Sequence, residues 1–360
     1  MKSNYKPIGK HIRLVDERNK GWRVQQLLGL SISKQFIPSV ANIIGTDMEN
    51  YKIIRKNQFA CSTMQVRRDK KMPVALLKDL NEAIISQAYP IFEVKDEKEL
   101  LPEYLMMWFE RSEFDREACF HAIGGVRGSL EWEDFENMLL PIPHIDKQQE
   151  IVKEYNTIQN CIALNQQFIQ KLEETAQAIY REWFVEGVDL ENLPEGWVTG
   201  KLSDLIEIKY GKAYSHLEEG NIPLYGSGGL MSKVNKPLYN EPSVLIPRKG
   251  TLSNIMFVNH PFWCVDTMFY SVLNDEVNGY YSYYILKQLD FDALNQGSAV
   301  PSMTTAFLND IDVVLPSKNI LSDFNNILIK LTTHKENIET ENQKLTELKE
   351  LLLSKLATVE

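Results

Sequence analysis

Arginine, lysine and glycine gather in three short clusters that could bind the phosphates and base edges of a nucleic acid. Arginine can donate two parallel hydrogen bonds to guanine, and lysine and backbone amides hold phosphates. The predicted DNA-binding residues of these clusters are Arg67, Arg68, Lys70 and Lys71 in the first, Tyr225, Ser227 and Lys233 in the second, and Arg248 and Lys249 in the third. The alternative interpretation is that all three are ordinary surface loops of an α+β fold.

Two glycine-rich loops near the ends of two globular stretches supply three more candidates. The loop at 124–129 contains Arg127, and the loop at 296–302 ends at Ser302 and is followed closely by Thr304. Glycine lets the backbone approach a ligand closely, so we add Arg127, Ser302 and Thr304 to the predicted DNA-binding set. Clusters of this kind in both stretches favour a binding function.

The motifs of common enzymes are missing from the sequence. It has no Gly-x-x-x-x-Gly-Lys-Ser/Thr loop, no His-Glu-x-x-His pair, no Gly-x-Ser-x-Gly elbow and no Asn-Pro-Pro-aromatic or Asp-Pro-Pro-aromatic tetrapeptide. Residues 225–229 are predicted to form a turn and not a dinucleotide loop, because Met231 replaces the third glycine and Pro237 would break the following helix. We therefore predict no catalytic residue.

Metal chemistry has equally little support. The Glu-Val-Lys triplet at 93–95 resembles a nuclease motif, but a metal-dependent nuclease needs a further carboxylate on a neighbouring strand. The cysteines Cys61, Cys119, Cys161 and Cys264 are not spaced like zinc ligands and are interpreted as buried thiols. We predict no metal ligand and no cofactor bound by this chain.

The charge of the chain is unevenly distributed. The net charge of −10 would by itself disfavour nucleic acid. Residues 52–78, however, carry eight cations and one anion, whereas residues 146–195 carry four cations and ten anions. A local basic patch, and not the net charge, is the electrostatic signature of phosphate binding. The same basic run is also compatible with a solvated surface loop.

A repeated pattern divides the chain into globule, long helix, globule and long helix. Residues 139–143 lead into a helical pattern that contains Gln-Lys-Leu at 170–172. Residues 313–316 lead into a second helical pattern that contains Gln-Lys-Leu at 343–345. A chain built in this way is suited to touching a partner at two places.

Apolar residues recur along both helices at steps of three and four, as in a coiled coil. The first helix is predicted to start with Asp146 as its N-cap and to stop at Gly187. Its seam comprises Ile158, Ile162, Asn165, Ile169, Leu172, Ala176, Ile179 and Trp183. The seam of the second comprises Leu331, Ile338, Leu345, Leu352 and Leu356, broadened by Leu348 and Leu351. Because the apolar stripe of each helix must be buried against another element, we expect the two helices to pack against each other. We expect them to be antiparallel, with the globules at opposite ends.

The globules repeat each other more weakly than the helices do. Residues 6–12 resemble residues 200–206 at the start, and residues 128–132 align with residues 303–307 near the end. Strands are predicted at 242–247 and 261–265, and short helices at 101–111 and 280–289. The mixture of short strands and helices predicts the α+β fold class.

The arrangement resembles the specificity subunit of a type I restriction–modification enzyme over essentially the whole chain. The most specific parts are the two Leu-Pro exits into long helices and the paired segments 165–184 and 338–356. The Leu-Pro-Glu-Gly-Trp turn at 193–197, the strand end at 246–251 and the loop at 297–304 are also similar to target-recognition domains of that family. The first globule lacks the Pro-Glu-Gly-Trp turn and the Arg-Lys-Gly-Thr strand end.

The resemblance implies two α/β target-recognition globules separated by two long antiparallel helices that form a coiled coil. The implied bounds are 1–145 and 193–316 for the globules, and 146–192 and 317–360 for the spacer helices. Each globule would read half of a split site in double-stranded DNA. The helices would set the gap and dock methyltransferase subunits, typically two. The residues expected to bind these partners are Ile169, Leu172, Ile179, Trp183, Leu345 and Leu352.

The resemblance assigns the chemistry to the partners. The methyltransferase subunits would bind S-adenosylmethionine and methylate adenine, and a restriction (motor-nuclease) subunit could join them. This chain would be a non-catalytic specificity subunit. No apolar run approaches the ~18 residues that span a bilayer, and residues 1–6 begin no signal segment, so we expect no membrane contact and a cytoplasmic location.

Two rival interpretations stay open. A coiled-coil scaffold would bind only protein, and a complex without sequence-specific DNA binding would favour it. A self-contained DNA-modifying enzyme would carry unrecognised motifs, and methyl transfer by the chain alone would favour that reading. A homodimer of half-subunits is a third possibility, but a chain with both globules does not need one.

Overall fold

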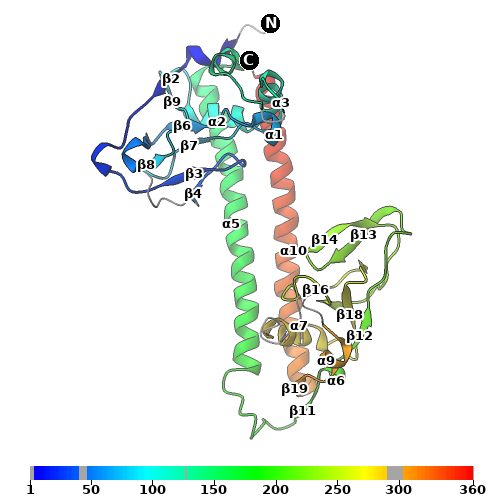
Figure 1. The fold of residues 1–360 in the computed structure, drawn as a ribbon. Coiled ribbons are helices and arrows are strands. Elements are labelled where there is room, and N and C mark those ends of the chain that lie inside the picture. The colour runs from blue at the N-terminus through cyan, green and yellow to red at the C-terminus, as the bar shows by residue number, and fades with distance from the viewer. Residues whose placement is uncertain (1–3, 40–46, 126–127, 290–302, 360) are drawn as a thin grey trace. The chain divides into compact units, whose positions relative to one another are not determined.

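The computed structural model describes residues 4–39, 47–125, 128–289 and 303–359. Two of the predicted DNA-binding residues, Arg127 and Ser302, therefore lie outside the described residues. Strands and helices alternate in the globular parts, which confirms the α+β class (Figure 1). No helix among the described residues is both long enough and apolar enough to cross a membrane.

The chain divides into two compact units. The first comprises Met1–Asn165 with Glu341–Glu360, and the second comprises Gln166–Thr340. Two long helices, α5 (Ile145–Phe184) and α10 (Lys318–Lys355), each contribute one end to each unit. A globule and a pair of antiparallel helix ends therefore make up each unit.

The first globule is built on a four-stranded antiparallel sheet in the order β2-β9-β6-β7. These strands are β2 (Ile12–Val15), β9 (Ile91–Val94), β6 (Gln58–Cys61) and β7 (Val74–Leu76). Two further strand pairs are β3 (Leu28–Leu30) with β4 (Phe36–Pro38), and β5 (Lys52–Arg55) with β8 (Glu82–Ile85). Helix α2 (Pro102–Glu110) lies at the predicted position and buries most of its residues in the core.

The second globule repeats this sheet with the strand order β12-β18-β15-β16, again entirely antiparallel. Its strands are β12 (Ile206–Tyr210), β18 (Met268–Leu273), β15 (Ser243–Pro247) and β16 (Met256–Val258). A separate sheet joins β13 (Glu219–Gly226) to β14 (Gly229–Val234) and β17 (Trp263–Cys264). Helix α7 (Asn278–Gln288) confirms the second predicted short helix. The strand predicted at 261–265 is only two residues long.

Both globules begin and end in the same way. Strand β1 (Tyr5–Pro7) pairs with β10 (Leu139–Pro141), and β11 (Val198–Lys201) pairs with β19 (Asp312–Leu315). A short helical turn follows at Ile8 in the first globule and at Leu202 in the second, before β2 and β12. The predicted alignment of residues 6–12 with 200–206 is therefore confirmed.

The predicted alignment near the ends is wrong by two residues. Helix α4 (Trp132–Asn137) and helix α9 (Thr305–Asn309) occupy the same place before the final strand. Leu130 therefore corresponds to Met303, where the sequence comparison had placed Gly128. The corrected offset equals the one that relates the two Gln-Lys-Leu segments. Sequence similarity in this short stretch was too low to fix the alignment, whereas the helix starts do.

In the first unit, the start of α5 packs against the end of the chain. Ile151 and Tyr155 share a hydrophobic core with Leu353 and Leu356. The fully buried Gln148 side chain ties this first turn of α5 to the globule, because its amide donates to the carbonyl oxygens of residues 99 and 143 and accepts from the amide of residue 101. Burial of each large apolar side chain contributes roughly 1.5–3 kcal/mol.

In the second unit, the end of α5 packs against the start of α10. Tyr180 and Phe184 share a core with Phe324 and Leu328, and the Phe184 and Phe324 rings meet edge to face at 4.9 Å. Helix α5 ends at Phe184, and the turn that follows includes Gly187 at a φ of +80°, a left-handed conformation that glycine adopts without strain. The two helix pairs are antiparallel, as expected.

The predicted seams are correct with one exception. The residues of the α5 seam are buried or half-buried, and Asn165 in its middle donates a 3.0 Å hydrogen bond to Asn342. Leu348 and Leu351, however, are 48% and 50% exposed, so neither is a buried member of the seam. Leu348 lines an open hollow together with the seam residues Ile158 and Leu352. Cys161 on α5 is also exposed, whereas Cys61 and Cys264 are buried as predicted.

Candidate nucleic-acid interface

In the second globule, two strands end side by side and place Arg248 against Tyr210. Strands β12 and β15 both pair with β18, where Tyr210 lies opposite Phe269 and Pro247 lies opposite Met268. The Arg248 guanidinium therefore comes to lie over the Tyr210 ring, 5.4 Å from its centroid. A cation over an aromatic face is attracted by the negative charge of that face. The predicted site does not include Tyr210. The one sequence feature that could have indicated it is an aromatic residue at the end of a strand.

The glycine-rich turn predicted at 225–229 connects β13 to β14 and lies beside the loop that follows Arg248. The Asn254 side chain donates to the carbonyl oxygen of Ser227 at 2.9 Å. Gly250 has a φ of +85°, and a Cβ atom there would lie 2.8 Å from the Ser227 Oγ. Only glycine fits such a position without strain. The second and third predicted clusters therefore form one surface.

Three further predicted residues lie on or near this surface. The amide of Met303 donates to the carbonyl oxygen of Arg248 at 3.0 Å, which brings Thr304 close, but the Thr304 hydroxyl caps α9 by accepting from the amide of Phe307. The Tyr225 hydroxyl is hydrogen-bonded to His260 at 3.0 Å, and burial raises the pKa of this phenol. Lys233 is exposed on β14, some residues beyond the turn. Lys249 is also exposed.

In the first globule, the basic cluster and the glycine-rich loop also lie together. Arg67 in α1 (Val66–Asp69) donates through Nη1 to the carbonyl oxygen of Gly124 at 2.9 Å, and its amide bonds Gly128. Arg68 forms an ion pair with Asp69 at 2.6 Å, and this bond raises the pKa of Arg68. Lys70, at a φ of +52°, and Lys71 are exposed. Lys70 and Lys71 are therefore more available to an external anion than the two arginines of this cluster, which are bonded within the chain.

The strand registers identify which residues of the first globule stand where Arg248 and Tyr210 stand in the second. Counting from the matched starts of β2 and β12, Asp16 takes the place of Tyr210. Counting from the matched starts of β6 and β15, Thr63 takes the place of Arg248. The Thr63 carbonyl oxygen accepts from the amide of Leu130, which is the counterpart of the bond from Met303 to Arg248.

This edge of the first sheet carries a hollow of about 300 Å³. Asp16, Lys52, Thr63 and Trp132 are among the residues that line it. None of these four was in the predicted site, because residues so distant in the sequence are brought together only by the strand pairing. The same edge thus differs in chemistry between the globules.

The charged residues considered for metal chemistry have structural partners. No group of three or more potential metal ligands is found among the residues that the structure describes. Glu93, the acid of the nuclease-like triplet, accepts hydrogen bonds from Arg13 at 2.7 Å and Gln58 at 2.8 Å within the sheet. These bonds occupy the carboxylate in a structural role.

The residues predicted to bind partners lie in the helix seams. Leu172, Ile179 and Trp183 are at least half-buried in the second unit, as is Leu352 in the first. Ile169 and Leu345 are half-buried. Leu172, Ile179, Trp183 and Leu352 pack against the cores of the chain itself, and the binding of all six residues to a partner stays a prediction.

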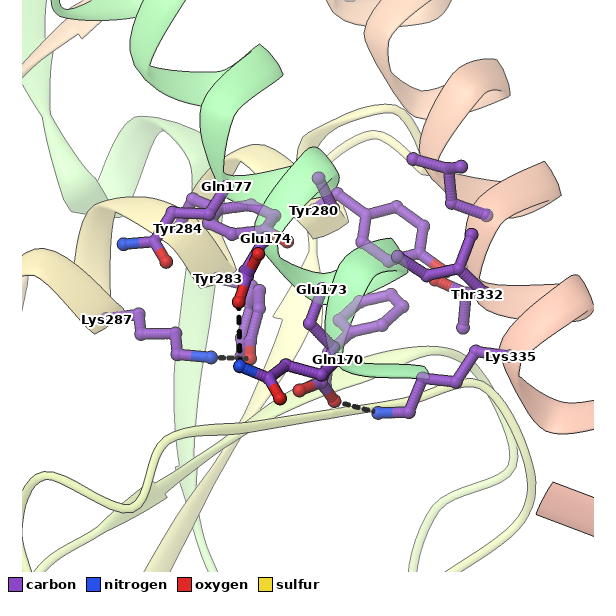
Figure 2. Close-up of a pocket in the computed structure, with 14 residues that line it drawn as sticks. Gln170, Glu173, Glu174, Gln177, Tyr280, Tyr283, Tyr284, Lys287, Thr332 and Lys335 are labelled. Carbon is purple, nitrogen blue, oxygen red and sulfur yellow. Dashed lines mark hydrogen bonds and ion pairs between the residues drawn. The ribbon is translucent and has the colours of Figure 1, made fainter. Parts of the chain in front are cut away.

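A cavity of about 300 Å³ lies between α5, α7 and α10 in the second unit (Figure 2). Glu173 forms an ion pair with Lys335, and Lys287 donates to the Tyr283 hydroxyl at 2.9 Å. Tyr280 also lines the cavity (Figure 2). The ion pair and the hydrogen bond occupy four of the polar groups that line this cavity between packed helices.

Comparison with known proteins adds a family to this geometry. A family model described as "Type I restriction modification DNA specificity domain" matches residues 41–174 and 194–350. The HindI type I restriction enzyme specificity subunit of Haemophilus influenzae is 20% identical, over 88% of this chain and 89% of its own length. The MjaVIII specificity subunit of Methanocaldococcus jannaschii is 26% identical over 23% of this chain and 22% of its own length.

Two solved structures share the fold. The S subunit of a type I restriction–modification system from M. genitalium superposes with a TM-score of 0.66 at 16% identity, covering 98% of this chain and 95% of that chain. A chain from a study of assembly and conformational transition in the type I system gives a TM-score of 0.53 at 18% identity, with 98% and 96% covered.

Proposed function

The chain belongs to the type I restriction–modification DNA specificity family, and from that premise we propose that it reads a split target in double-stranded DNA. The observation that carries the proposal is the repeated sheet edge. One scaffold ends in Arg248 and Tyr210 in the second globule and in Thr63 and Asp16 in the first. Two matching scaffolds with unlike edges suit a target made of two unlike half-sites.

The exposed lysines fit the phosphate contacts of such a reader. Lys70 and Lys71 in the first globule and Lys233 and Lys249 in the second are exposed. No ion pair is recorded for these four within the described chain. Lysine ammonium groups on flexible stems can follow the backbone of a duplex and fix the register of the protein on it. The side chains fixed at the strand ends would then contact the base edges.

We further propose that the helices dock methyltransferase subunits, two of them by analogy with the family. In the first unit a hollow of about 500 Å³, mostly apolar, is lined in part by Ile158, Leu348 and Leu352. Leu348 in this lining and Leu351, about one helical turn further on, are half exposed, and exposed apolar side chains in one region are characteristic of protein interfaces. S-adenosylmethionine would bind to the partner subunits, which would methylate adenine, and a restriction subunit could join the complex.

Mapping of methylated adenines tests the proposal. The chain would be purified with the methyltransferase subunits of its host and incubated with unmethylated genomic DNA and S-adenosylmethionine. We expect methylation at one motif with two specific halves and a fixed gap, and no methylation by the chain alone. The Arg248→Ala, Lys249→Ala double variant should relax or weaken one half only.

A matched control is Lys287→Ala, because Lys287 lies in the same unit but already bonds the Tyr283 hydroxyl. It should leave the motif unchanged. Methylation by the chain without partners would contradict the specificity-subunit assignment in favour of a self-contained enzyme. A complex that binds partners but selects no DNA sequence would favour the scaffold.

A further inference from the structure

Among the arginines that the structure describes, Arg248 is one of two that form no ion pair with a described carboxylate. The arginines that form an ion pair with Asp or Glu are Arg13, Arg18, Arg23, Arg55, Arg68, Arg111, Arg116 and Arg181. Within the described part of the chain, Arg67 and Arg248 form no such pair. Arg67 is instead bonded to the carbonyl oxygen of Gly124. Arg248 is thus a cation whose charge is left for another partner.

The backbone of Arg248 is fixed on both sides. Its amide donates to the carbonyl oxygen of Thr267 at 2.9 Å, and its carbonyl oxygen accepts from the amide of Met303 at 3.0 Å. It directly follows β15, whose five residues are all buried. The Cα atom therefore stands on the rigid part of the globule, as a precise contact requires.

The side chain of Arg248 is restrained as well. Its guanidinium lies 5.4 Å from the centroid of the Tyr210 ring, and its Nη1 is 3.5 Å from the carbonyl oxygen of Asp266. The Tyr210 side chain is itself half exposed, so the stack stands at the surface. A guanidinium held against an aromatic face loses less conformational freedom when it forms two parallel hydrogen bonds.

We propose that Arg248 reads a guanine in the half-site of the second globule, with Tyr210 as its positioning residue. This inference rests on the proposed function. A planar guanidinium donates two hydrogen bonds to the O6 and N7 acceptors that guanine presents in the major groove. Adenine presents a donor at the position of O6, so the same geometry rejects it. The adjacent Lys249, exposed and flexible, suits the phosphate instead.

The first globule makes the inference specific to one half-site. Thr63 and Asp16 stand at the positions of Arg248 and Tyr210, and neither can form the two-bond contact to guanine that arginine forms. A preference for guanine at this structural position therefore belongs to the second half-site alone. Changes at Arg248 should leave the first half-site untouched.

The experiment measures base preference with the assembled complex. Duplexes randomised at each position of the second half-site would compete for binding to the complex of this chain with its methyltransferase subunits. We expect the native complex to prefer guanine at one position by about 5- to 150-fold. Arg248→Ala should remove most of that preference, because it deletes the donors to guanine. Preferences at the other positions and in the first half-site should not change.

Two tyrosine variants test the positioning role. Tyr210→Phe keeps the aromatic face and should keep the guanine preference, whereas Tyr210→Ala should reduce it several-fold. A purely structural role of Tyr210 would lower the affinity for all sequences alike and would not move the preference at one position. Arg181→Lys is the matched control, since Arg181 of the same unit is paired with Glu186. It should change nothing.

The outcomes separate the possible failures. If Arg248→Ala keeps the guanine preference, the inference is overturned. If Arg248→Ala weakens binding to all sequences equally and reduces the salt dependence of binding by about one ion, Arg248 contacts phosphate and the inference is again overturned. If the native complex selects a sequence that has no guanine at a position sensitive to Arg248, the inference is wrong and the proposed function stands. If the native complex selects no sequence, the proposed function itself fails.

Discussion

The two globules share one scaffold and differ at its edge and in its centre. At the edge, Arg248 faces Tyr210 in the second globule where the first has Thr63 and Asp16. In the centre, the first globule stacks the Phe59 and Phe92 rings at 4.9 Å. The sheet topology tolerates both solutions because it is set by backbone pairing and by the alternation of buried side chains, and not by any one residue type.

In the second sheet, Val244 and Ser271 stand at the positions of Phe59 and Phe92, and Ser243 precedes Val244. Ser243 donates through its hydroxyl to the carbonyl oxygen of Ser271 at 2.7 Å, and the Ser271 hydroxyl accepts from the amide of Val244 at 2.8 Å. Both serines are fully buried. Hydroxyl groups thus join β15 to β18 at this row, where the first globule stacks two aromatic rings on paired strands. The comparison shows that the two globules share one sheet topology, while the residues at the edges of the two sheets differ.

The largest expected effect is the loss of the aromatic stack in the first globule. Phe92→Ala should lower the free energy of unfolding by about 3–5 kcal/mol, because it removes buried contacts and leaves a cavity. Urea unfolding, together with hydrogen exchange of the β9 amides, would measure the change. Phe120→Ala is the control, since that ring is 81% exposed, and it should cost no more than about 0.5 kcal/mol. Equal effects of the two variants would mean that the stack is not the centre of this globule.

A smaller effect is expected from the serine pair of the second globule. Ser271→Ala should cost about 1–3 kcal/mol, because the buried amide of Val244 loses its acceptor. Hydrogen exchange at Val244 should become faster. Ser232→Ala on the exposed face of β14 provides the control. If Ser271→Ala costs no more stability than Ser232→Ala, the hydroxyl of Ser271 does not stabilise the pairing of β15 with β18.

The smallest effect is expected in the helix seam. Asn165 bonds Asn342, whereas the residues at matching positions in the repeat, Ile338 and Ile169, are apolar. The single variants Asn165→Leu and Asn342→Leu should each lower the melting temperature, because each leaves one amide facing an apolar side chain. The double variant should recover that loss. A double-mutant cycle should give a coupling of about 0.5–1.5 kcal/mol. Additive changes would show that the two amides do not act as a pair.

The sequence predicted the long helices well because their signal is local and repeated. Apolar steps of three and four recur over many turns, so errors at single positions cancel, and the helix ends follow from Gly187 and the Leu-Pro exits. Leu351 is one of three consecutive leucines, which cannot all face one partner on a helix, and Leu348 lies at the open margin of the seam. Only the packed helix pair shows which of them lie outside the stripe.

The site was predicted only in part, since its members come from strands far apart in the chain. The cationic side chains of Arg248 and Lys249 indicated a binding role from the sequence alone. The glycines indicated the turn, because glycine adopts the backbone conformations that a tight turn requires. It missed Tyr210, Asp16 and Thr63. These become visible only through the strand registers, because the pairing of β12 and β15 with β18 brings their ends together.

The sequence by itself determined the α+β class, the two long helices, the repeat of globule and helix, and the absence of common catalytic motifs. These properties depend on short-range periodicity and on residue types, which a linear chain displays directly. The tertiary structure alone decided which residues share the edge of each sheet, and it corrected the alignment of the two globules. Those decisions depend on hydrogen-bonded register between distant strands, and a shift of one residue there turns every side chain to the other face.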